Sequence, residues 1–150
     1  MSYQEKSVTV SLVSYLLILG YYLTRILHMF QDGGLVSSQL FGLWAIVIIA
    51  TILVIILGNI LANIVLSIVH AIRTRSNEVE RYLADERDRL ISLKSVRIAY
   101  ITFSVGVFLS MLIFALGQSA LVMFGLIIFF SISAGIVGEI SQIYLYRRGF

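Results

Sequence analysis

The segment LFGLWAIVIIATILVIILGNILANIVLSIV, residues 40–69, contains no charged residue. A helix needs about 20 residues to cross the hydrocarbon core of a bilayer, so this segment is long enough to span one. Three further apolar blocks lie at about 7–30, 98–117 and 120–146. Lipid offers no hydrogen-bond partner to an open backbone, which favours helices in all four. We predict an all-α fold, a polytopic membrane four-helix bundle that makes one transmembrane domain of residues 1–150.

Composition supports this prediction. Hydrophobic residues make up 59% of the chain and charged residues 13%, whereas a soluble domain carries roughly 25% charged residues. The chain has no cysteine, which excludes disulfides and cysteine-ligated metals. It also has no proline, which argues against the broken helices found in many transporters.

The basic residues predict the orientation of the spans. Ten of the eleven lie beside the N-terminus, between the second and third spans, or beside the C-terminus, and Arg25 is the exception. Lys and Arg are enriched in cytoplasmic segments. We therefore expect both termini in the cytoplasm, and the positive-inside bias explains the net charge of +3 without any direct contact with nucleic acid.

The connections between spans differ in length. Gly33 and Gly34 follow the first block, where glycine is a usual helix stop, and spans three and four are joined by a short turn at 117–119. The cytoplasmic segment 77–97 has helical spacing of apolar residues and a capping signal at Asn77 and Glu80. We predict one helix from about Glu78 to Leu116, so that the third helix extends roughly 30 Å into the cytoplasm.

Glu139 is the most unusual residue of the fourth span. It precedes Arg147 by eight residues, which places it roughly 12 Å inside the cytoplasmic boundary by helical rise. A carboxylate at that depth is costly unless it is paired, protonated or wetted. Polar residues of other spans fall near the same level when depth is counted from their own basic ends. The predicted intramembrane polar network comprises Glu139, Asn59, Asn63, Ser67, His70, Ser104 and Gln142.

Three interpretations of this network stay open. It can fix helix register, it can bind a proton or cation, or it can make a contact between subunits of a homo-oligomer. A second charged set, Arg25, His28 and Asp32, lies near the outer end of the first span and is more typical of interfacial snorkelling with one ion pair. Tyr21, Tyr22 and Trp44 fit the outer aromatic belt.

The segment ADERDRLISLKSVRIAY, residues 84–100, runs straight into the third span. It resembles the signature D-E-R-D-x-x-I-x-x-K of a family of small bacterial four-helix inner-membrane proteins. The resemblance implies a bacterial inner (plasma) membrane and a protein partner, such as a small helix-turn-helix regulator, and it assigns no activity. The residues that carry it, which we take as the partner-docking set, are Asp85, Glu86, Arg87, Asp88, Ile91 and Lys94.

The sequence favours a non-enzymatic protein that contacts the lipid bilayer and a partner through its cytoplasmic helix. The alternative is a small proton- or cation-coupled transporter or channel that works through Glu139. The two histidines, His28 and His70, fall near opposite faces of the membrane and cannot ligate one iron. We predict no catalytic residue, no cofactor and no metal site.

Overall fold

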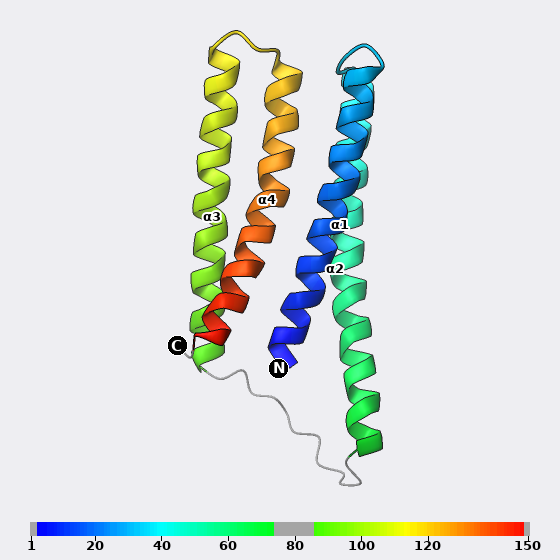
Figure 1. Ribbon diagram of the computed structural model, residues 1–150, viewed down its shortest axis with the longest axis vertical. Helices are drawn as coiled ribbons and strands as arrows, with labels where there is room; N and C mark the ends of the chain where they lie inside the picture. The colour runs from blue at the N-terminus through cyan, green and yellow to red at the C-terminus, as the bar shows by residue number, and fades with distance from the viewer. Residues whose placement is uncertain (1–2, 74–85, 149–150) are drawn as a thin grey trace.

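The structure is a computed structural model, and its described residues form four long helices (Figure 1). It describes the backbone of residues 3–73 and 86–148, and the side chains of residues 7–53, 56, 60, 64 and 88–148. The helices are α1 (Tyr3–Gln31), α2 (Ser37–Arg73), α3 (Glu86–Ala115) and α4 (Ala120–Arg147). This confirms the all-helical fold.

Three of these helices are long and apolar enough to cross a membrane. The qualifying segments are Ser7–Gln31, Asp88–Ala115 and Ala120–Arg147. In α2 the described apolar segment is Ser37–Leu53, although the helix itself continues to Arg73. Crossing by α2 therefore stays a prediction. The extension predicted for the third helix also stays one, because residues 74–85 lie outside the described part of the chain.

Glycines end α1 and α3 at the turns that join each helix to the next. Gly33 and Gly34 have φ of 110° and 113°, and Gly117 has φ of 97°, a region that side chains with a Cβ rarely adopt. Ser119 then caps α4 by accepting a hydrogen bond from the Val122 amide at 3.3 Å. Both turns lie at one end of the molecule, here named the loop end, and the predicted stop after α1 is confirmed (Figure 1).

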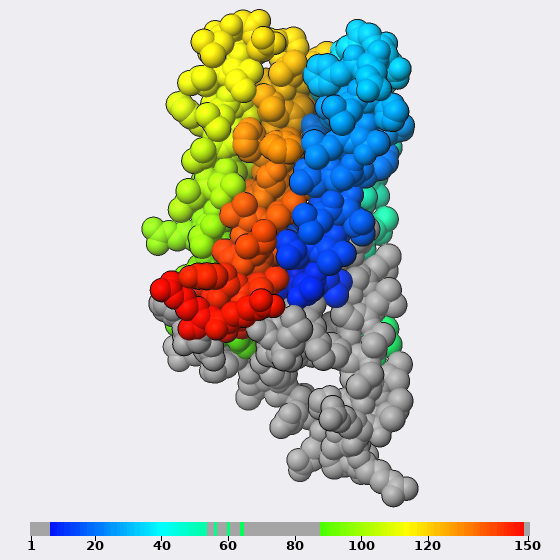
Figure 2. Space-filling view, in the orientation of Figure 1, coloured from blue at the N-terminus to red at the C-terminus, as the bar shows by residue number. Residues whose placement is uncertain are grey.

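The helices pack in the order α3, α4, α1, α2. Helix α4 packs against α3 on one side and α1 on the other, α1 also packs against α2, and α2 makes a small contact with α4. On the face shown in Figure 2, α4 lies between α3 and α1. Within the described residues, α3 contacts neither α1 nor α2. The bundle is therefore open on one side, and α4 is its central element.

An apolar core joins α1, α2 and α4. Tyr22 of α1 is 2% exposed, and its hydroxyl donates to the carbonyl oxygen of Gly125 in α4 at 2.6 Å. The sequence placed Tyr22 in the aromatic belt, which is wrong, because the hydrogen bond satisfies the phenol inside the core. The buried members of this core are Ile18, Tyr22, Leu40, Leu43, Val47, Ile128, Ile132 and Ile136.

Small residues form the contact between α3 and α4. A Cβ atom built on Gly106 would overlap the Cβ and Cγ atoms of Phe130, and one built on Gly138 would lie 3.0 Å from the Cβ of Ala99. Ser110 is fully buried and donates to the Gly106 carbonyl at 2.7 Å. Membrane helices approach closely where their facing residues are small, so these positions set the separation and register of the pair.

Candidate functional site

Glu139 belongs to α4 and lies next to α1, which packs against this helix. Its side chain is half-buried, and it interacts electrostatically with Tyr15 of α1. The Tyr15 ring lies against Gly135, one turn earlier on α4, where a Cβ would meet its Cε1 atom at 2.6 Å. The absence of a side chain at Gly135 thus makes room for the ring next to the carboxylate. Sequence analysis did not select Tyr15.

A second polar contact lies one turn beyond Glu139, on the side of α4 that faces α3. Ser95 is 3% exposed, and its hydroxyl donates to the Ser92 carbonyl at 2.8 Å and lies 3.4 Å from Oε1 of Gln142. Gln142 therefore makes a polar contact with Ser95, and its membership of a network around Glu139 stays a prediction. Among the side chains described, none donates a hydrogen bond to the carboxylate of Glu139.

The register of α3 and α4 fixes the level of Glu139. Gly138 faces Ala99 and Ser95, so Glu139 lies about level with Arg97. Eighteen residues separate Arg97 from Ala115 at the loop end, which corresponds to about 27 Å of helix. The hydrocarbon core is about 30 Å thick. A layer of that thickness that begins at the loop end would end near Glu139, and the depth of roughly 12 Å expected from the sequence stays a prediction.

Ser104 does not belong to the network, and this prediction is wrong. Its side chain is exposed, and its hydroxyl donates to the carbonyl of Tyr100 at 2.9 Å within α3. It lies seven residues, about 10 Å, from Arg97 toward the loop end. The error arose because Arg97 was taken to mark the same depth as Arg147, whereas packing places Arg97 about two turns deeper.

The remaining network residues lie on α2. Asn59, Asn63, Ser67 and His70 belong to the helical backbone of α2, but their side chains lie outside the described residues. Their spacing of four, four and three residues still places them along one stripe of the helix. Contact between this stripe and Glu139 stays a prediction.

The docking set divides between described and undescribed positions. Asp85 lies outside the described residues, as do the side chains of Glu86 and Arg87. Lys94 is exposed and Asp88 is half-buried. Ile91 is 2% exposed, so its assignment to a docking surface is wrong: it is an inward-facing residue of α3.

The exposed apolar residues of this part of α3 are ones that sequence analysis did not select for docking. Leu90, Leu93 and Val96 are 54%, 58% and 62% exposed. They alternate with Ile91 and Ser95, which are buried. We name Leu90, Leu93 and Val96 the α3 apolar strip. By the register above, the strip lies between the level of Arg97 and the start of α3, at the end of the helix opposite the loop end.

Neither a metal site nor a known relative adds to this description. Among the described residues, no group of three His, Cys, Asp or Glu side chains is arranged to hold a metal ion. In the comparisons with known proteins, no family model, no curated protein and no solved structure matches this chain.

Proposed function

We propose that this chain is a non-enzymatic protein of the bacterial inner membrane that recognises a protein partner through the first part of α3. The α3 apolar strip carries the proposal. In a hydrocarbon layer of about 30 Å that begins at the loop end, these exposed apolar side chains would lie outside the lipid, which favours a partner that covers them. Arg89 and Arg97 are also exposed beside the strip. The partner surface that fits is apolar with an acidic margin, and a small helix-turn-helix regulator is the first candidate to test.

The membrane arrangement that we propose has four spans. Three helices have the required length and composition, and the uncharged stretch 40–69 supports a fourth crossing by α2. An even number of crossings leaves both termini on one side. Ten of the eleven basic residues belong to that side, and such a bias is typical of the cytoplasm.

Site-specific photo-crosslinking tests the docking proposal. A photoreactive amino acid at Leu93 should yield a discrete product with one partner protein in intact cells, and Leu90→Ser should reduce that product several-fold by removing apolar contact. Ile140 provides the matched position, since it is 52% exposed and lies at about the same level on α4. Equal products from Leu93 and Ile140, or products that Leu90→Ser leaves unchanged, would contradict the proposal.

Glu139 supports a second candidate function, proton or cation movement. The half-buried carboxylate beside Tyr15 lies at the level where polar residues of α1, α3 and α4 meet, and an ionisable residue near hydrocarbon is a candidate ion site. In this candidate the α2 stripe, which lies farther from the loop end than Glu139 does, delivers the ion to Glu139 from the cytoplasmic side.

Proteoliposomes separate this candidate from a structural role. We expect the wild-type protein to dissipate an imposed pH gradient and Glu139→Gln to reduce the rate at least tenfold, because the amide does not titrate. Asp88→Asn is the control, since it removes a carboxylate from the start of α3. Equal rates for wild type and Glu139→Gln, with both proteins equally stable, would exclude ion movement through this residue.

A further inference from the structure

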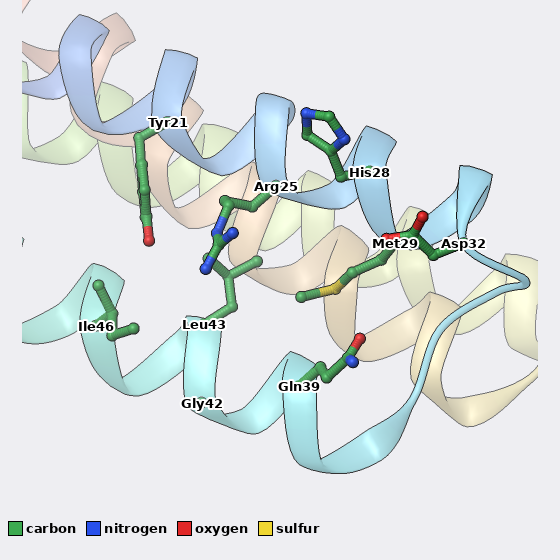
Figure 3. A pocket seen from close by; sticks show the side chains of 9 residues that line it. All are labelled: Tyr21, Arg25, His28, Met29, Asp32, Gln39, Gly42, Leu43 and Ile46. Atoms are coloured by element: carbon green, nitrogen blue, oxygen red, sulfur yellow. The ribbon is translucent and has the colours of Figure 1, made fainter.

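A cavity of about 300 Å³ lies between α1 and α2 near the loop end. Figure 3 shows the side chain of Arg25 extending from α1 toward α2, with Gln39 on the opposite wall. Leu43 and Ile46 of α2 contribute apolar lining, and Gly42 contributes no side chain. The residues that line the cavity are Tyr21, Arg25, His28, Met29, Asp32, Gln39, Gly42, Leu43 and Ile46.

Arg25 brings a permanent positive charge to this cavity. It precedes the end of α1 at Gln31 by six residues, about 9 Å, a depth at which a cation in lipid is costly without a partner. Its guanidinium lies 5.9 Å from the centre of the Tyr21 ring. No carboxylate described in the structure forms an ion pair with it, and Asp32 lies seven residues further along the chain, just past the end of α1. Arg25 therefore does not take part in the ion pair that the sequence analysis expected in this set.

We infer that the cavity binds a phosphate group, and that its source is the headgroup of a membrane phospholipid. The guanidinium group of Arg25 can donate two hydrogen bonds to phosphate oxygens, and the side-chain amide of Gln39 on the facing helix can donate a third. Met29, Leu43 and Ile46 offer an apolar wall for the first part of an acyl chain. A volume near the lower limit of ligand pockets suits a headgroup better than a larger solute.

Arginine substitution is the first test. The full-length protein in detergent micelles is titrated with phosphatidylglycerol, and bound lipid is counted by native mass spectrometry. Arg25→Gln should weaken lipid binding about tenfold, because a charge-assisted hydrogen bond is lost. Arg148→Gln is the matched control, since Arg148 lies 5.7 Å from the ring of Tyr144 in the same i, i+4 relation but on the opposite end of the molecule. Equal losses in both variants, or none in Arg25→Gln, overturn the inference.

Filling the cavity is the second test, and it leaves the charge unchanged. A Cβ on Gly42 would meet no atom within 4 Å, so Gly42→Leu should fold and occupy the space, with a several-fold loss of bound lipid. Gly20 is equally open but does not line the cavity, and Gly20→Leu should bind lipid as the wild type does. Normal lipid binding by Gly42→Leu would show that the lipid does not bind in this cavity.

Inorganic phosphate distinguishes the two sources of the same chemical group. If the headgroup is the ligand, phosphatidylglycerol binds at far lower concentration than inorganic phosphate, and both depend on Arg25. If inorganic phosphate binds as tightly as phosphatidylglycerol and competes fully with it, the cavity is still a phosphate site, but the phospholipid headgroup is overturned as the source of the phosphate. Lipid binding that depends on the acyl chains and not on Arg25 would overturn both.

Discussion

Gly106→Ala should destabilise the protein by about 1–3 kcal/mol, the usual cost of forcing an extra methyl group into a packed contact. The new Cβ would overlap Phe130 at its Cβ and Cγ atoms. Because the Cβ of Phe130 is fixed to the backbone of α4, rotation of its ring cannot clear the overlap. The helices must move apart, and this cost should exceed the gain in helix propensity of up to about 1 kcal/mol on replacing glycine by alanine.

Unfolding of the purified protein in a single detergent measures this effect. Gly20→Ala is the control, because Gly20 is helical, exposed and open around its Cα, and it should be neutral or slightly stabilising. Phe130→Ala should not fully restore Gly106→Ala, since alanine keeps the obstructing Cβ. Gly106→Ala that is as stable as Gly20→Ala would show that α3 and α4 are not held at the separation described.

Gly135→Leu should also destabilise the protein by about 1–3 kcal/mol, but through a different neighbour. The atoms nearest to a Cβ at Gly135 are Cε1 and Cζ of Tyr15, at 2.6 and 2.7 Å. They belong to the far end of a side chain that can rotate. The substitution should therefore displace the ring from α4 and from Glu139, without requiring α1 to leave.

A double-mutant cycle measures this coupling. In Gly135→Leu/Tyr15→Ala, the leucine can occupy space that the ring has left, so the pair should be more stable than the sum of the single effects by about 0.5–3 kcal/mol. The control is the pair Gly106→Ala/Phe130→Ala, in which the second substitution should restore little of the stability that the first one removes. Additive effects of the two substitutions would contradict the described contact between Tyr15 and Gly135.

The fold was largely predictable, because each of its determinants is local in sequence. Uncharged blocks of sufficient length predict helices, and Gly33, Gly34 and Gly117 provide the backbone conformations that end them. What could not be read from the sequence is helix order. Among the described helices, α3 packs only against α4. The apolar pattern of α3 does not indicate this, because lipid and protein accept the same apolar side chains.

The candidate site was predictable only in part, because it depends on register between helices. Glu139 and Gln142 were selected because a polar residue in an apolar block is conspicuous. Ser104 was selected in error, and Ser95 and Tyr15 were missed, because depth was counted separately on each helix from its nearest basic residue. Registers here follow from contacts at Gly135 and Gly138, and the depth of a basic residue can vary because its long side chain reaches toward water.

The central place of α4 has a consequence for biosynthesis. A ribosome releases this chain from its N-terminus, so α1 and α2 can pair as soon as both have left it. Helix α3 then enters the membrane before the helix that it packs against in the described structure has been made. It must therefore stay without this packing partner, at the insertion machinery or among lipids, until α4, which follows the short turn at Gly117, has been made. Assembly of these four helices is thus completed only after α4, the last of the four in the sequence, has been translated.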